Sequence, residues 1–360
     1  DHMTVSRLRH LVRGRSAAEA FGMAAGTHPP SPAIASVFAR DSALAEQWRR
    51  SAQRRDPLAC WEASVAAGVE VVTPSDPSVP PQLAADPACP AVLFVRGDLS
   101  VLDARRVGIV GTRNATQAGR ATAARFGCEL SDAGVVVLSG LARGIDAAAH
   151  RGALTSPNAS PVAVVGCGLD RPYPKQNSDL WEQVATRGAL ISEWPVGTAP
   201  DAFRFPLRNR ILAALIEVLV VVESRASGGS LITVREAVDR SVDVMAVPGS
   251  VHSRASEGTN ALLSDGAITA TETADVLMAL GLDHRRARRS RFDARPPLEG
   301  IDADVYAACR DTPRTIDAIM MITDRQIGEA AMLLARLERA GWLVETGGWF
   351  EAADEWAELA

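Results

Sequence analysis

The chain has 360 residues, 47% of them apolar and 22% charged, which is typical of a globular protein and unlike a disordered one. No apolar run approaches the roughly 20 residues that a membrane-spanning helix needs, and no signal peptide is recognisable, so we expect a cytoplasmic protein without membrane contact. The five cysteines are scattered, with no C-x-x-C pair, which argues against a zinc ribbon or a disulfide framework.

The formal net charge of −5 is unevenly distributed. Residues 3–57 hold nine arginines against four acids, whereas residues 298–360 hold five arginines against thirteen acids. A nucleic-acid site must therefore be a local basic patch. The acidic C-terminal part is expected to contact protein, because binding a DNA backbone requires a positive surface.

Residues 3–57 are predicted to form a small helical N-terminal region, which Pro29, Pro30 and Pro32 interrupt. The core, 58–280, repeats an apolar strand, a Gly or Ser turn and an amphipathic helix. Its strands are "RVGIVG", "VVVLSG", "PVAVVGCG", "ALISE", "VLVVVES", "VDVMAVPG" and a short "AIT". Near-continuous apolar strands that alternate with helices indicate a parallel sheet covered on both faces. The predicted fold class is therefore α/β, with an extended Rossmann-like parallel sheet as its core.

Two further segments follow the core. Residues 281–297 include six arginines and end in two prolines, so a solvated basic linker is favoured over a dedicated DNA-binding arm. Residues 298–353 show three helical patterns and then a hairpin whose turn is Gly347-Gly348. This order predicts a C-terminal winged-helix domain.

Four strand ends carry residues suited to holding anions. They combine glycines, which let backbone N–H groups approach a ligand, with hydroxyl or basic side chains before a helix. Such ends meet at one edge of a parallel sheet, where they form a row of anion sites that suits a polyphosphate chain. The predicted phosphate-binding residues are Gly111, Thr112, Arg113, Ser139, Gly140, Arg143, Gly144, Phe205, Arg208, Asn209, Ser227, Gly228 and Ser230.

Arg113 distinguishes the first of these loops from common nucleotide-binding loops. It stands where a dinucleotide loop keeps a small residue, and its bulk suits a phosphodiester oxygen better than a pyrophosphate lying flat on the loop. The sequence also lacks the acid expected after the second strand and the Walker lysine, so NAD and ATP are poor candidates. We expect neither a cofactor nor a metal ion.

Three neighbouring side chains are given supporting roles. Asp146 and His150 lie four residues apart on one helix face, and a hydrogen bond that fixes a loop is favoured over an acid–base pair. Arg210 is expected to pair internally with an acid. For Phe203 and Phe205, stacking on bases and packing in the core are equally compatible with the sequence.

Seven motifs occur in a specific order along the core. They are "GIVGTRNATQAG", "LSGLARGIDAAAHRGAL", "VVGCGLDRPYPKQNSDL", "ISEWP", "FPLRNRILAAL", "SGGSLIT" and "AVPGS…EGTNALLSDGA". In content and order the chain resembles the DNA-processing protein A (DprA) family, also called Smf. The resemblance is strong from about residue 71 to 280, and residues 298–351 are similar to the family's winged-helix tail.

The resemblance implies a non-enzymatic protein that binds single-stranded DNA, forms a homodimer and helps to load a RecA-type recombinase during natural transformation or recombination. The family's phosphate-gripping Gly-Ser-Arg motif falls on Gly111, Thr112 and Arg113. The basic Arg-Asn-Arg stretch falls on residues 208–210. The dimer is expected to form through the α/β core, where the apolar segment 242–247 is a candidate sheet edge.

Two other classes of function remain open. The stretch "GGSLITVRE" loosely resembles the phosphate loop of nucleoside-monophosphate phosphoribohydrolases, which place a glutamate at the spacing of Glu236 from Thr233. Two extra apolar residues between the glycines and Thr233 argue against that enzyme. The third interpretation is a regulatory protein that acts mainly through its acidic tail.

Overall fold

A computed structural model describes residues 4–12, 14–282 and 298–353. These residues form two compact units, one before and one after the segment 283–297, and each unit is described by itself. Most of the arginine-rich stretch expected to be a linker thus lies outside the described residues. Among the residues that are described, no helix is both long and apolar enough to cross a membrane.

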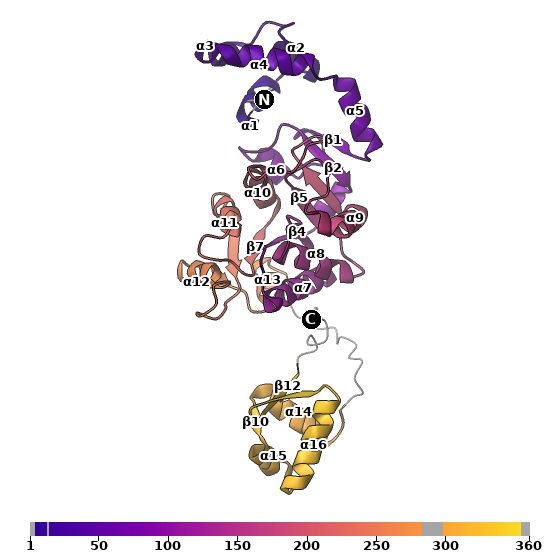
Figure 1. Ribbon diagram of the computed structural model, residues 1–360, viewed down its shortest axis with the longest axis vertical. Coiled ribbons are helices and arrows are strands. Elements are labelled where there is room, and N and C mark those ends of the chain that lie inside the picture. The colour runs from indigo at the N-terminus through magenta and orange to yellow at the C-terminus, as the bar shows by residue number, and fades with distance from the viewer. Residues whose placement is uncertain (1–3, 13, 283–297, 354–360) are drawn as a thin grey trace. The chain divides into compact units, whose positions relative to one another are not determined.

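Five helices open the first unit (Figure 1). Ser16, Ser31, Asp41 and Asp56 cap the second to fifth helices, each accepting a hydrogen bond from a backbone N–H in the first turn. Helical structure extends beyond the predicted limit at residue 57, because the residue after Asp56 is a proline that starts the last helix. The five are α1 (Val5–Val12), α2 (Ala17–Ala25), α3 (Pro32–Arg40), α4 (Ser42–Gln53) and α5 (Pro57–Ala66).

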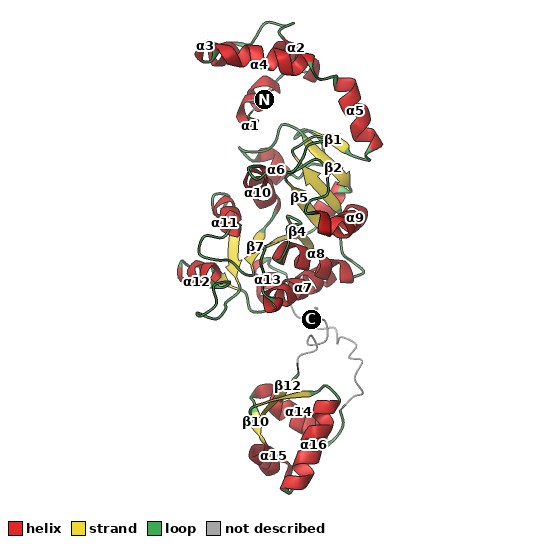
Figure 2. Ribbon diagram, in the orientation of Figure 1, coloured by secondary structure: helices red, strands yellow, loops and turns green. Residues whose placement is uncertain are grey.

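A nine-stranded sheet forms the centre of the first unit (Figure 2). All seven predicted strands are present, and two preceding strands pair antiparallel at one side, which makes the sheet mixed. The strands are β1 (Glu70–Val72), β2 (Leu93–Gly97), β3 (Arg106–Val110), β4 (Val136–Ser139), β5 (Val162–Val165), β6 (Ala189–Ser192), β7 (Val218–Val221), β8 (Asp243–Ala246) and β9 (Ile268–Thr269).

The strand order is β1-β2-β6-β5-β4-β3-β7-β8-β9, and all neighbours from β6 to β9 are parallel. The chain proceeds from β3 to β6 in one direction and then returns to place β7 on the other side of β3. In doubly wound sheets, ligands bind at such a reversal, outside the carboxyl ends of the strands. The suggestion that residues 242–247 form a sheet edge is wrong, since β8 lies between β7 and β9.

Helices cover both faces of the sheet. The helices that follow β3 and β4, and the last helix of the core, pack on one face of the sheet. The helices that follow β6 and β7 pack on the other face. The α-helices of the core are α6 (Pro81–Ala85), α7 (Gln117–Asp132), α8 (Ile145–Thr155), α9 (Ser178–Arg187), α10 (Arg204–Leu215), α11 (Ser230–Val238), α12 (Glu257–Ser264) and α13 (Thr273–Ala279). Helices α7 and α8 approach very closely because Gly127 and Gly152 have no side chain to collide with the facing backbone.

The second unit has the predicted winged-helix organisation, with three helices and a small antiparallel sheet in the order β10-β12-β11. Its elements are α14 (Ile301–Asp311), β10 (Arg314–Thr315), α15 (Ile316–Thr323), α16 (Ile327–Arg339), β11 (Leu343–Thr346) and β12 (Trp349–Ala352). The predicted hairpin turn is confirmed, and Gly347 and Gly348 adopt φ values of 61° and 86°, which favour glycine. Leu333, Leu334 and Trp342 belong to a hydrophobic core of its own.

Candidate functional site

A pocket of about 610 Å³ lies at the reversal of strand order, outside the carboxyl ends of β3, β4 and β7. The first turns of α10 and α11 complete its wall. Most of the predicted phosphate-binding residues line this pocket, together with Asp146. They are Gly111, Thr112, Arg113, Gly140, Phe205, Arg208, Asn209, Ser227, Gly228 and Ser230.

Three predicted residues are not part of the pocket wall. The Ser139 side chain is buried, and its hydroxyl donates to the carbonyl oxygen of Ile109 at 2.6 Å. Gly144 has φ 79° and lies so close to the backbone of Thr112 that a side chain would collide there. Both residues therefore support the fold around the site, whereas Arg143 is exposed at the surface beside it.

Arg113 is an exposed cation at the pocket wall, as is Arg225. The Arg113 guanidinium lies 5.3 Å from the centre of the Phe205 ring, which is itself 5.3 Å from the ring of Tyr173. The Arg113 guanidinium, the Phe205 ring and the Tyr173 ring thus form a continuous stack. A cation over an aromatic ring is attracted electrostatically to the face of that ring. The Phe205 ring is only partly buried and faces the pocket, so it is not a core residue, and stacking on bases stays a prediction. Phe203 is 55% exposed and is not a core residue.

The loop that carries Arg113 is held by Glu223, the second residue after β7. The amide of Thr112 donates to the Glu223 carbonyl oxygen at 2.8 Å, and the amide of Thr116 donates to its carboxylate at 2.9 Å. Thr116 also caps α7 by accepting from the amide of Gly119. The expected sharing of a phosphate by these backbone amides is therefore not available at Thr112 or Thr116.

Arg208 forms the buried floor of the pocket. Its Nε donates to Asn209 Oδ1 at 3.0 Å, a second nitrogen donates to the carbonyl oxygen of Val164, and the guanidinium lies directly against Gly140. Burial lowers the pKa of Arg208, while attraction to Asp146 opposes that shift. Only an anion that enters the pocket can reach this side chain, and the contact of Arg208 with a phosphate stays a prediction.

Asp146 fixes a loop, as the sequence favoured, but without His150, whose two ring nitrogens have no hydrogen-bond partner among the residues that the structure describes. Its Oδ2 accepts from the amide of Gly140 at 3.1 Å, which holds the turn after β4. Burial raises the pKa of Asp146, and the nearby Arg208 opposes this increase. Burial also lowers the pKa of His150 to about 3, so that His150 is neutral near pH 7. A buried, neutral His150 outside the pocket wall does not act as an acid–base partner there.

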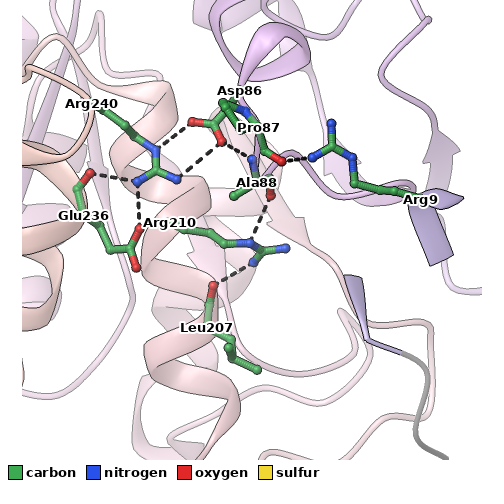
Figure 3. Close-up of polar contacts among 8 residues, drawn as sticks. All are labelled: Arg9, Asp86, Pro87, Ala88, Leu207, Arg210, Glu236 and Arg240. Atoms are coloured by element: carbon green, nitrogen blue, oxygen red, sulfur yellow. Dashed lines mark hydrogen bonds and ion pairs between the residues drawn. The ribbon is translucent and has the colours of Figure 1, made fainter. Parts of the chain in front are cut away.

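The predicted internal ion pair of Arg210 is present. Arg210 Nη2 lies 2.7 Å from Glu193 Oε1, and both side chains are largely buried. Figure 3 shows two further bonds of this guanidinium, to the carbonyl oxygens of Ala88 at 3.0 Å and Leu207 at 2.7 Å. Arg210 thereby ties α10 to the loop before β2, away from the pocket.

We expect Arg210→Ala to lower the free energy of unfolding by about 3 kcal/mol, because it leaves the Glu193 carboxylate buried without its cation. Urea denaturation checks this result. Arg235→Ala, which removes an exposed arginine from α11, is the matched control and should change stability little. Equal stability of the two variants would contradict the structural role of Arg210.

Glu236 is not placed for the chemistry of the hydrolase alternative. Its carboxylate lies 2.7 Å from Arg240 Nη1, and Arg240 Nε also lies 2.7 Å from Asp86 (Figure 3). Glu236 is absent from the pocket wall. A phosphoribohydrolase would need that carboxylate beside the bound nucleotide.

Helices α10 and α11 present their N-terminal ends to the pocket, and neither has a side-chain cap. Ser230 Oγ is bonded to Ser224 Oγ at 2.9 Å, which fixes the start of α11. Uncapped N-terminal amides carry a partial positive charge that favours an anion.

Three further residues line the pocket that sequence analysis did not identify as site residues. They are Tyr173, Asp201 and Arg225. The sequence pattern could have identified two of them, because Arg225 directly precedes the "ASGGS" turn and Tyr173 lies in the loop after β5. Within the described residues, no group of three or more His, Cys, Asp or Glu side chains is arranged to hold a metal ion.

These features define a Rossmann-like protein with an arginine- and aromatic-lined pocket at the reversal of its sheet. Residues 70–281 match the model of the DNA recombination-mediator protein A family, and the chain belongs to that family.

Relatives and solved structures agree with this assignment. Protein Smf of Escherichia coli is 34% identical over 275 residues, which cover 75% of this chain and 73% of the relative. The structure of DNA processing protein A from Streptococcus pneumoniae has a TM-score of 0.59 and 33% identity, covering 66% of this chain and 82% of that one. The Helicobacter pylori protein, described with a unique single-stranded DNA binding mode, has a TM-score of 0.54 and 27% identity, covering 59% and 95%.

Proposed function

We propose that this protein binds single-stranded DNA in the pocket at the sheet reversal and acts as a recombination mediator that helps to load a RecA-type recombinase. The observation that carries the proposal is the combination of the exposed Arg113 stacked on Phe205 with the buried Arg208 beneath. A phosphate meets the cations, and an unstacked base meets the aromatic rings. The relative from Helicobacter pylori, whose described property is single-stranded DNA binding, supports this ligand.

Single-stranded DNA fits the site better than duplex DNA. The pocket wall holds the Phe205 and Tyr173 rings, on which unstacked bases can pack, beside cations that can contact the backbone. Binding should therefore depend little on sequence. The protein would work without catalytic turnover, since the carboxylate needed by the hydrolase alternative lies outside the pocket.

Assembly is part of the proposal. A homodimer through the α/β core would place two pockets on one DNA strand, which increases avidity without any new contact in either site. The exposed edge of the sheet at β9, rather than β8, is available for this contact. Light scattering on a chain that ends near Leu280 should show a dimer, and a monomer at micromolar concentration would refute this placement.

Fluorescence anisotropy with labelled oligonucleotides tests the function. We expect tight binding of poly-dT and of mixed-sequence single strands with similar affinities, and clearly weaker binding of duplex. Strand exchange by a RecA-type recombinase should then be faster on DNA that carries this protein. Preference for duplex or for one short sequence would overturn the proposal, as would release of base from AMP or CMP at a useful rate.

A further inference from the structure

Phe203 places an exposed aromatic ring at the start of α10. Its side chain is 55% exposed, and the residue occupies the N-cap position of the helix with φ −71° and ψ −19°. An N-cap normally carries Ser, Thr, Asp or Asn, whose side chain accepts a hydrogen bond from the first turn, and Phe203 supplies no such bond. Neither burial in the core nor capping of the helix therefore accounts for this ring.

The position of Phe203 is the rim of the DNA pocket. Residues 200–202 before it and Phe205 and Pro206 after it line the pocket, whereas Phe203 itself is not part of the wall. Successive Cα atoms are about 3.8 Å apart, so Phe203 lies one residue outside the wall. A strand that leaves the pocket over the start of α10 passes this ring.

Arg204 packs against the Phe203 ring. The Arg204 guanidinium lies 4.9 Å from the centre of the ring, and its Nη1 donates to the carbonyl oxygen of Ala199. The cation is attracted to the face of the ring that it covers, while more than half of the Phe203 side chain stays open. A ring that is already held in place loses little conformational freedom when a flat group packs on it.

The charges at this rim favour a base over a phosphate. Asp201, two residues before the ring, is exposed and lines the pocket. Its carboxylate repels a phosphate, and the nearby Arg204 is already engaged with the ring and with Ala199. A base is uncharged, so it meets no such repulsion and gains from stacking on the aromatic face.

We propose that Phe203 is a second base-stacking platform, which receives a base of the strand where that strand leaves the pocket. This inference rests on the proposed function and deepens it. The ligand is a run of consecutive nucleotides, of which one base meets Phe205 inside the pocket and a later one meets Phe203 at the rim. Because every base has a π face, this platform accepts any sequence.

Anisotropy titrations of the full chain with two labelled strands of equal length test the proposal. One strand is oligo-dT, and the other carries the same phosphates and sugars without bases. Phe203→Ala should weaken oligo-dT binding by about tenfold, since one base–aromatic stack contributes on that order, and should leave binding of the base-free strand unchanged. The salt slope for oligo-dT should equal that of the parent protein, because no phosphate contact is lost. Phe203→Trp should retain tight binding.

Trp61→Ala is the matched control, since Trp61 is also 55% exposed but lies on α5, outside the pocket wall. It should bind both strands as the parent does. Unchanged oligo-dT binding by Phe203→Ala would overturn the inference and leave the proposed function intact. Equal losses on both strands would also overturn it, because the residue would then act on the backbone. If the parent protein bound neither strand, the proposed function would fail together with the inference.

Discussion

Replacing Arg113 by alanine is expected to weaken single-stranded DNA binding by about tenfold or more, which corresponds to about 1.4 kcal/mol. Arg113 is exposed at the pocket wall, so it can meet a phosphate directly. Loss of one phosphate contact should reduce the slope of log affinity against log salt by about 0.7. Titrations by anisotropy at several salt concentrations measure both quantities.

The melting temperature of Arg113→Ala should remain close to that of the parent protein, because the Arg113 side chain is exposed and its attraction to the buried Asp146 ranks below that of Arg208. Arg235→Ala again serves as the control, since it removes an exposed arginine outside the pocket wall. Its affinity and salt slope should be nearly unchanged. If Arg113→Ala behaved in the same way, the DNA strand would have to follow another route and the proposed function would lose its main support.

Replacing Arg208 by alanine should have a larger and different effect, lowering both DNA affinity and stability. The side chain is only 6% exposed, so Arg208 supports the fold in addition to its predicted role as a phosphate contact. Its loss removes the donors to Val164 and Asn209 and takes from the buried Asp146 the stronger of its two cationic attractions, which come from Arg208 and Arg113. We expect a decrease of about 3 kcal/mol in the free energy of unfolding, measured by urea denaturation.

Arg208→Lys separates the two roles of this residue. Lysine keeps the charge at the pocket floor but lacks the planar fork that bonds two partners at once. Affinity, measured well below the melting temperature, should therefore recover more than stability does. If Arg208→Ala were as stable as the parent protein, the buried hydrogen bonds of Arg208 would contribute nothing to the free energy of unfolding. If its DNA affinity were unchanged, the ligand would not reach the pocket floor.

The interpretation of the strand ends was accurate where a local pattern has one structural solution. Gly111 and Gly140 follow apolar strands and precede helices, and in a parallel sheet such ends share an edge whatever the details of packing. The internal pairing of Arg210 was also predictable, because an arginine within an apolar helix must be neutralised. The partner of Arg210, Glu193, could not be predicted, since it comes from another strand end.

Sequence analysis was insufficient where strand order or depth decided the outcome. The apolar pattern of segment 242–247 is compatible with an edge strand and with an interior strand. Only the pairing with β9 shows that the strand is interior. Arg208 looks like any basic residue near a strand end, but the bonds to Val164 and Asn209 hold it in the pocket floor. Tyr173 was missed because the loop after β5 had to fold back to bring its ring against Phe205.

The sequence by itself determined the α/β class, the seven core strands, the winged helix and the set of glycine turns that meet at the pocket. These features follow from local periodicity and turn chemistry, which depend on residues close together in the chain. Only the tertiary structure decided that Arg113, Phe205 and Tyr173 form one stack, that Arg208 lies beneath them, and that Glu236 lies elsewhere. The physical reason is that these relations join segments tens of residues apart, and the reversal of strand order between β6 and β7 brings those segments to one edge of the sheet.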